Sequence, residues 1–273
     1  MKNNIDVTVL LPIHKFDNET IKPMILDSVN SVVDQKVYPK ELKLIFPLEV
    51  MDEDFNSFIE EIKKPLTDKK IILTLCSNEG ETDFCSQINK GVSEVKTKWF
   101  SILEFDDVYT NIMFDNFNKY QKDNGEDIGI YLSINMLYDK EGKFLSFNNE
   151  IVHSFGFQDI EIDLGFIGND SLSVYSEYQM TGGIFQTKLY NEHGGLKPSI
   201  KVTFWNEFLL RMIGKGVKAF VIPKIGYKHI LGREDSISDY IYKNVDVDEM
   251  NFWVKTAKSE SFCKVDRDIK YNK

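Results

Sequence analysis

Apolar runs alternate with amphipathic segments along the first part of the chain. The apolar runs cover residues 6–13, 42–50, 70–77 and 98–105, and the segments between them cover residues 19–35, 52–66 and 83–95. Short apolar runs without polar alternation are typical of strands that are buried on both faces. Strands that alternate with helices pair in parallel, with the helices on the faces of the sheet. This order predicts an α/β fold with a doubly wound, mostly parallel sheet flanked by helices.

The segments between these strands carry helix signals. Apolar side chains recur at helical spacing in residues 19–35, at Ile21, Ile25, Val29 and Val32. Residues 52–66 open with acidic side chains, which suit the positive end of a helix, and Pro65 predicts that this helix stops there. Residues 83–95 are expected to form the third helix.

The second half of the chain is less regular. Residues 127–147 predict a hairpin around Gly142, which can adopt a positive φ angle. Residues 148–175 show weak periodicity and are expected to form a long loop region. A helix at 204–216, a strand at 217–230 and a C-terminal helix near 246–262 complete the prediction.

The composition limits the classes of partner. A net charge of −10 over 273 residues disfavours non-specific binding to nucleic acid or to an anionic membrane.

The cysteines and the apolar runs bear on the compartment. The three cysteines, an odd number without metal-site spacing, are interpreted as reduced thiols of a cytoplasmic protein. No stretch approaches the roughly 20 apolar residues that span a bilayer, so no transmembrane segment is expected.

Three carboxylates follow the fourth predicted strand within four positions. They are Glu104, Asp106 and Asp107. Carboxylates repel one another, and removing an unpaired one from water is costly. Ligands of doubly wound sheets bind at the carboxyl ends of the strands, where this acidic cluster lies. We therefore expect a positively charged partner for the cluster at that edge of the sheet.

Four segments together resemble a family-2-type glycosyltransferase with the GT-A fold. They are residues 7–35, 76–111, 182–199 and 208–238, and they include an Asn-Lys-Gly helix, the acidic motif, a repeated Gly-Gly and a loop histidine. The resemblance implies a Rossmann-like sheet with a smaller acceptor-side β/loop region. It also implies a single domain over 1–273, in which 1–110 bind the nucleotide sugar, 111–240 form the acceptor-side half and 241–273 form a helical extension.

The resemblance implies a metal-dependent enzyme that transfers a sugar, with inversion, from a nucleotide-diphosphate sugar to a hydroxyl acceptor. In that family Mn²⁺ or Mg²⁺ bridges the acidic motif and the diphosphate, since hard cations prefer oxygen ligands. Asp106 matches the metal-binding position, and Glu104 matches a position that contacts the metal or a ribose hydroxyl. Asp107 matches a donor-site acid or a helix N-cap. His229 matches a loop histidine that reaches the metal, although a structural role is the alternative.

Further donor-site positions follow from the same resemblance. They are Pro12, Ile13 and His14 after the first strand, Glu49 after the second, Asn78 and Gly80 after the third, Asn89 on the next helix, and Arg233 near the C-terminal end. Arg233 is expected to close over the diphosphate, because a guanidinium matches phosphate geometry. The plainer alternatives are a surface role for His14 and a solvated helix position for Asn89.

The chain departs from the family where the catalytic base is expected. The family has a Glu-Asp pair, with an arginine six residues after the Asp. Counting back from Arg211 places Phe204 and Trp205 on that pair. Glu207 lies about one helical turn further on, so we predict it as the base, or alternatively as an ion-pair partner of Arg211.

The missing pair leaves a second function open. The alternative is a degenerate GT-A domain that binds a nucleotide sugar or another carbohydrate without turnover. The expected acceptor is a glycan, and a modified nucleobase or a protein are the less favoured acceptors.

Overall fold

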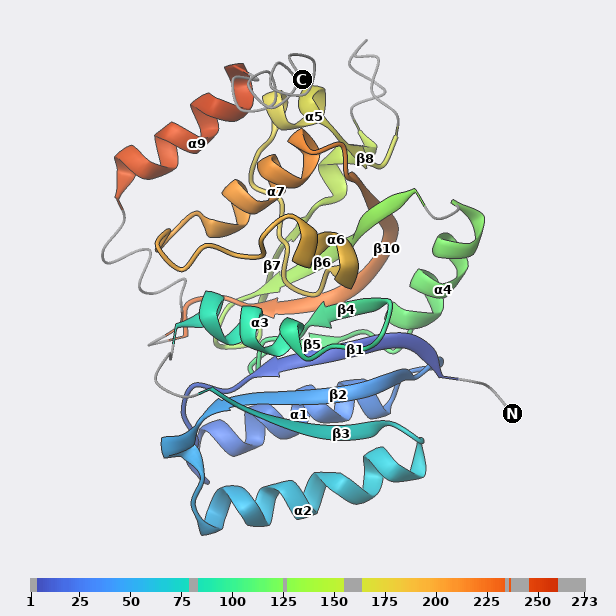
Figure 1. Ribbon diagram of the computed structural model, residues 1–273, viewed down its shortest axis with the longest axis vertical. Helices are drawn as coiled ribbons and strands as arrows, with labels where there is room; N and C mark the ends of the chain where they lie inside the picture. Colours follow the sequence, from blue (N-terminus) through green and yellow to red (C-terminus); the bar gives the residue numbers. More distant parts are fainter. Residues whose placement is uncertain are drawn as a thin grey trace.

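One mixed sheet runs through the described part of the computed structural model, which comprises residues 4–78, 83–124, 127–154, 164–233, 236 and 246–259 (Figure 1). Its strands are β1 (Ile5–Pro12), β2 (Pro39–Pro47), β3 (Ile72–Asn78), β4 (Trp99–Ile102), β5 (Val108–Tyr109), β6 (Ile128–Tyr138), β7 (Phe144–Asn148), β8 (Phe166–Ile167), β9 (Ile184–Gln186) and β10 (Lys218–Ile230). The order is β3-β2-β1-β4-β9-β6-β10-β5, with β7 beside β6 and β8 beside β10. β1–β4 pair in parallel and β6 pairs in parallel with β10, whereas β9 is antiparallel to β4 and β6.

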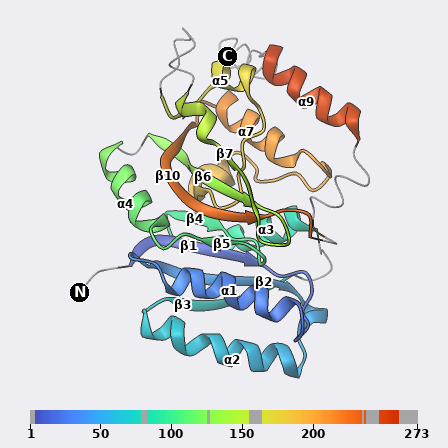
Figure 2. The same cartoon turned by 180° about the vertical axis from the view of Figure 1, so that it is seen from behind.

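Helices cover both faces of this sheet. They are α1 (Ile21–Val33), α2 (Glu53–Asp68), α3 (Phe84–Ser93), α4 (Met113–Asp123), α5 (Asn169–Val174), α6 (Thr187–Glu192), α7 (Phe204–Gly214) and α9 (Val247–Ser259), with short 3-10 turns η1 (Leu48–Val50) and η2 (Glu150–His153). The buried side chains of α1, α2 and α4 share one core cluster, and those of α3 and α7 share another. Figure 1 shows α3 in front of the sheet, and Figure 2 shows α1 on the opposite face.

Strand β1 shows why the apolar runs form buried strands. Val7, Val9 and Leu11 point into the core beneath α1 and α2, while Leu10 points into the core beneath α3. Successive side chains of a strand alternate between faces, so a strand covered on both sides is apolar on both of its faces, apart from polar residues with buried partners such as Thr8. The predicted α/β sheet with flanking helices is confirmed on this point.

Two aspartates begin helices on the carboxyl side of strands. Asp52 caps α2 by accepting a hydrogen bond from the amide of Phe55 at 2.8 Å, and Asp83 caps α3 by accepting one from the amide of Ser86 at 3.0 Å. Each side chain satisfies an amide that lacks a partner inside its helix. Both helices therefore start where the sheet's ligand-binding edge lies.

The prediction that Pro65 ends the second helix is wrong. Helix α2 continues to Asp68 with Pro65 inside it. Leu66 is fully buried, and the amide of Ile71 closes the last turn on the carbonyl of Leu66 at 2.9 Å. A proline costs the helix one hydrogen bond, and burial of the next apolar side chain outweighs that loss here.

The second half of the chain follows the prediction in part. The hairpin of β6 and β7 turns at Gly142, with a φ of 81°, as predicted. The expected long loop at 148–175 is wrong in its described parts, since η2, β8 and α5 lie there. Residues 155–163 of that prediction, and residues 260–262 of the predicted C-terminal helix, lie outside the described residues.

Two further expectations concern membranes and thiols. None of the helices in the described part of the chain is both long enough and apolar enough to cross a lipid bilayer. Cys76 and Cys85 are free thiols and both are buried. Cys263 lies outside the described residues.

Candidate active site

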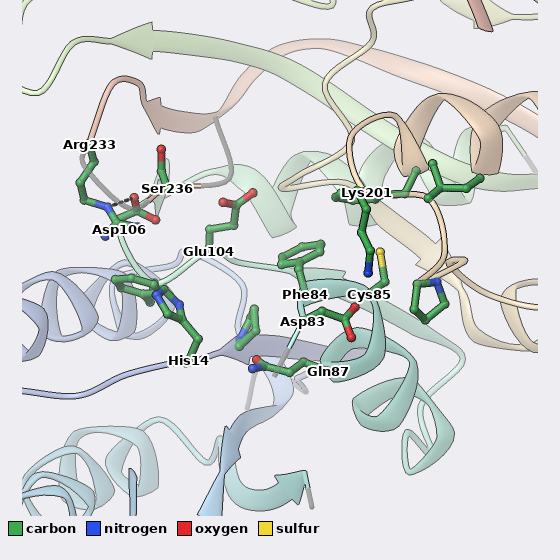
Figure 3. Close-up of a pocket in the computed structure, with 15 residues that line it drawn as sticks. His14, Asp83, Phe84, Cys85, Gln87, Glu104, Asp106, Lys201, Arg233 and Ser236 are labelled. Carbon is green, nitrogen blue, oxygen red and sulfur yellow. Dashed lines mark hydrogen bonds and ion pairs between the residues drawn. The ribbon is translucent and has the colours of Figure 1, made fainter. Parts of the chain in front are cut away.

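A cavity of about 480 Å³ opens at the carboxyl ends of β1, β3 and β4 (Figure 3). Its lining residues are Pro12, His14, Asp83, Phe84, Cys85, Gln87, Glu104, Phe105, Asp106, Pro198, Ile200, Lys201, Phe204, Arg233 and Ser236. One wall comes from the strand ends and from the start of α3. The opposite wall comes from the loop before α7 and from the segment after β10. Segments from both halves of the chain therefore meet at this cavity, at the edge where such sheets bind ligands.

Asp106 is paired with an arginine in this structure. Its carboxylate accepts a hydrogen bond from Nε of Arg233 at 2.6 Å, and the guanidinium lies 4.6 Å from the centre of the Phe105 ring. Burial and then the carboxylate of Asp107 raise the pKa of Asp106 above its ordinary value, and Arg233 opposes that shift. The positive partner expected for the acidic motif is thus an arginine that also lines the cavity.

Asp107 and His229 form a buried pair that joins the acidic motif to β10. The distance from His229 Nδ1 to Asp107 Oδ2 is 2.7 Å, and the amide of Ile230 donates to Asp107 Oδ1 at 2.9 Å. Burial alone would lower the pKa of His229, but the carboxylate of Asp107 raises it to about 9. This contact gives His229 and Asp107 a structural role at the junction of the acidic motif with β10. The role of His229 as a metal ligand stays a prediction.

Glu104 is the third carboxylate of the motif and lines the cavity beside Asp106 (Figure 3). Burial, followed by the charge of Asp107, raises the pKa of Glu104 to about 8. This shift favours the protonated form of Glu104, and a cation held there would favour the carboxylate, because ligand carboxylates release their protons on metal binding.

The oxygen atoms present fit a divalent cation shared with a substrate. No cluster of three or more metal-ligating side chains occurs among the described residues. Mg²⁺ is commonly held by one or two carboxylates, with substrate phosphates and water completing its octahedron. Asp106 and Glu104 line the cavity and are the carboxylates that could hold such an ion.

The other predicted donor-site residues divide into two groups. Pro12 and His14 line the cavity, and the His14 ring lies 5.1 Å from that of Phe105. Ile13 is fully buried, and Glu49 is exposed in η1; neither lines the cavity. The structure gives no support to a donor contact by these two side chains.

Three further predicted donor-site residues fall between positions 78 and 89 of the sequence. Asn78 is buried at the end of β3 and does not line the cavity, and Gly80 lies outside the described residues. Asn89 binds across to the loop before α7: it donates to the carbonyl of Leu196 at 2.7 Å and accepts from the hydroxyl of Tyr190 at 2.7 Å. These bonds favour a role for Asn89 in positioning the acceptor-side loop over a contact with the donor.

Glu207 is buried and forms ion pairs with Lys197 and Arg211. Its side chain is 0% exposed, and its carboxylate accepts from Lys197 Nζ at 2.6 Å and from Arg211 Nε and Nη2 at 2.8 and 3.0 Å. Burial alone would raise the pKa of Glu207, but hydrogen bonds from Arg211 and Lys197 lower it overall. A general base must reach the proton that it removes, and Glu207 does not line the cavity. The geometry supports its alternative role as the partner of Arg211, not the predicted role as base.

The residues at the missing Glu-Asp pair are aromatic and well packed. Phe204 lines the cavity, and its ring centre lies 5.6 Å from that of Phe84. Trp205 stacks on Phe185 with centroids 5.9 Å apart and planes inclined by 7°. Neither side chain can accept a proton. Phe204, the one of the two that lines the cavity, gives its wall an apolar surface.

Prediction from the sequence did not single out several lining residues. Asp83 and Phe84 begin the helix that follows β3, and the rule that ligands bind at strand ends would have found them. Ile200 and Lys201 belong to an irregular loop without any periodic signal. Burial raises the pKa of the Cys85 thiol to about 12, so this lining residue is no thiolate nucleophile.

The fold and the position of the cavity together define the GT-A fold of glycosyltransferases. No family model matches the chain, and no curated protein matches it by sequence. Solved structures with this fold do match. A mannosyltransferase from Pyrobaculum calidifontis, in complex with GDP-Man and Mn²⁺, superimposes with a TM-score of 0.60 at 12% identity, over 85% of this chain and 59% of its own.

The S. aureus protein TarS gives similar matches. TarS 1-349 in complex with UDP-GlcNAc has a TM-score of 0.59 at 12% identity, over 93% of this chain and 70% of its own. A second TarS structure has a TM-score of 0.56 at 13% identity, over 90% of this chain and 41% of its own. The chain thus spans less than half of that second TarS chain, and identities this low establish the fold alone.

Proposed function

We propose that the protein transfers a sugar from a nucleotide-diphosphate sugar to a hydroxyl acceptor, with inversion and with a divalent cation. The observation that carries this proposal is that Glu104, Asp106 and Arg233 line one cavity at the carboxyl end of β4, between both halves of a GT-A fold. Neighbours with this fold were solved with UDP-GlcNAc or with GDP-Man and Mn²⁺. The predicted division at residues 110 and 240 remains part of the proposal.

The donor side of the reaction rests on three charged residues. Asp106 and Glu104 would hold Mn²⁺ or Mg²⁺, which when bound neutralises charge that builds on the leaving diphosphate. When the donor binds, the Arg233 guanidinium exchanges the Asp106 carboxylate for the donor diphosphate and donates hydrogen bonds to the phosphate oxygens. Pro12 and His14 lie on the same wall and contact the nucleoside.

The acceptor side rests on the loop that leads into α7. Asn89 holds this loop to α3 through Leu196, and Arg211 donates to the carbonyl of Gly195 at 2.5 Å. We infer a glycan acceptor, because the wall that this loop completes carries apolar side chains beside one lysine. A modified nucleobase or a protein stays a less favoured acceptor, and the reduced-thiol composition supports a cytoplasmic location.

An Asp106→Asn variant tests the function. We expect the wild type to release nucleoside diphosphate from UDP-GlcNAc or GDP-Man with Mn²⁺, and the variant to lose about 100-fold or more of that rate, because removal of one electrostatic partner of the transition state costs that much. Chelation of the metal with EDTA should lower the rate to a similar degree. Asp115→Asn, which alters a surface ion pair with Lys119, is the control and should keep the full rate. Equal rates for wild type and Asp106→Asn would contradict the proposal.

A second function is favoured by one observation. Phe204 and Trp205 stand where the resemblance places the base, so a domain that binds nucleotide sugar without turnover is the alternative. Calorimetric binding of UDP or GDP, together with no release of diphosphate from any donor, would support that alternative over the enzyme.

A further inference from the structure

The attacking hydroxyl needs a proton acceptor that the cavity must supply from another element. Phe204 and Trp205 cannot take the proton, and Glu207 is closed off by Lys197 and Arg211. We propose that Asp83, the first residue before α3, is the catalytic base that receives the proton of the acceptor hydroxyl. This inference rests on the proposed sugar transfer and names the residue for its acceptor half.

Asp83 lies on the side of the cavity where an acceptor is expected. Three carboxylates of the described residues line the cavity, namely Asp83, Glu104 and Asp106. Figure 3 shows Asp106 with Arg233 at one side and Asp83 with Lys201 at the other. A single displacement needs the base on the face opposite the leaving group. Of these three carboxylates, Asp83 is the one separated from the acidic motif.

The backbone holds the Asp83 carboxylate in place. One oxygen accepts from the amide of Ser86 at 3.0 Å, which fixes the side chain at the start of α3. Lys201 points toward Asp83 from the opposite wall in Figure 3, and Phe84, Ile200 and Phe204 also line the cavity. A preoriented base loses little entropy when the substrate arrives. The carboxylate is therefore positioned for proton transfer before any acceptor binds.

The proposed step balances as a direct displacement. The acceptor oxygen forms a bond to the anomeric carbon while its proton moves to the Asp83 carboxylate. The bond between the anomeric carbon and the diphosphate oxygen breaks, and its electron pair leaves with the nucleoside diphosphate, which Arg233 contacts. Water can take the place of the acceptor hydroxyl, in which case the products are free sugar and nucleoside diphosphate.

An Asp83→Asn variant tests the base without removing the cap. Asparagine keeps an oxygen for the Ser86 amide but is not basic, and it is as good an N-cap as aspartate. With UDP-GlcNAc and GDP-Man as donors and water as acceptor, we expect kcat for diphosphate release to fall about 100- to 10,000-fold, the usual contribution of a general base. Affinity for UDP, measured by calorimetry, should change less than about threefold. Asp52→Asn, which replaces the corresponding cap of α2 outside the cavity, is the matched control and should keep the wild-type rate.

Chemical rescue separates a base from a structural residue. Asp83→Gly keeps most of the capping free energy, and added formate should restore part of its rate by supplying a carboxylate.

The outcomes distinguish the two proposals. Wild-type turnover with an undiminished Asp83→Asn rate overturns the base but leaves sugar transfer standing. UDP binding without turnover in the wild type overturns both the base and the enzymatic function. A large loss of rate that formate reverses in Asp83→Gly supports both.

Discussion

At the scale of single residues, Arg233 is the cationic partner of the acidic motif. It pairs with Asp106 and covers the face of Phe105. Under the proposed function, a cation held by Asp106 would displace that guanidinium, and a diphosphate would give it a new anionic partner. We therefore propose that Arg233 competes with metal before the donor binds and cooperates with the donor afterwards.

An Arg233→Gln variant separates these two effects. We expect its affinity for Mn²⁺ alone to rise about tenfold, because the competing charge is gone, and its affinity for UDP to fall about tenfold, because charged hydrogen bonds contribute about 1.5–3 kcal/mol. Titration calorimetry measures both. Lys119→Gln, which removes an exposed cation of the surface pair with Asp115, should change neither. A parallel change of both affinities in Arg233→Gln would contradict the competition.

At the scale of elements, the buried pair of Asp107 and His229 ties the end of β10 to the segment between β4 and β5. Asp107 is 0% exposed and His229 is 7% exposed. The charge attraction in this pair stabilises the fold only while the imidazole is protonated, since a neutral ring keeps only the hydrogen bond. The stability of this junction should therefore depend on pH.

The direction of that dependence follows from the raised pKa. His229 has a pKa of about 9 in the folded chain against the ordinary 6.5, so the folded state holds more protons between these values. The raised pKa of His229 adds on the order of 3 kcal/mol to the free energy of unfolding. This stabilisation is complete below pH 6.5 and is lost as the pH rises to 9. Urea unfolding at pH 6, 7.5 and 9 measures the slope. We expect His229→Gln to be less stable at pH 6 and to show a flatter profile; an unchanged slope would contradict the assignment.

Elements differ in how well the sequence predicts them. β1–β4 were predictable because both faces are covered, which leaves an uninterrupted apolar signal. β9 was missed because it has only three residues and its antiparallel pairing to β4 and β6 depends on distant partners. Within the cavity lining, Asp106 and Arg233 were predicted. Asp83 was not singled out although it follows β3, where the strand-end rule applies, whereas Ile200 and Lys201 reach the cavity only through the folding of an irregular loop.

At the scale of the whole molecule, the sheet and its cores join the two halves of the chain. β9 bonds to β4 on one side and to β6 on the other. One core cluster contains Val7 near the start of the chain and Tyr227 near the end of β10. The predicted single domain is consistent with this arrangement and is open to a direct test.

Urea unfolding of the full chain provides that test. We expect one transition, with the same midpoint by tryptophan fluorescence and by far-ultraviolet circular dichroism, because the shared sheet couples the halves. Trp99 in β4 and Trp205 in α7 report from the two halves. Separate midpoints for the two signals would contradict a single cooperative domain.

The spacing of the paired charges has a consequence for biosynthesis. Asp107 precedes His229 by 122 positions, and Asp106 precedes Arg233 by 127. A nascent chain on the ribosome therefore presents its acids long before their cationic partners have been translated. Both pairs form only after β10 and Arg233 have emerged, so a chain whose translation stops short of residue 229 lacks both cationic partners of the acidic motif.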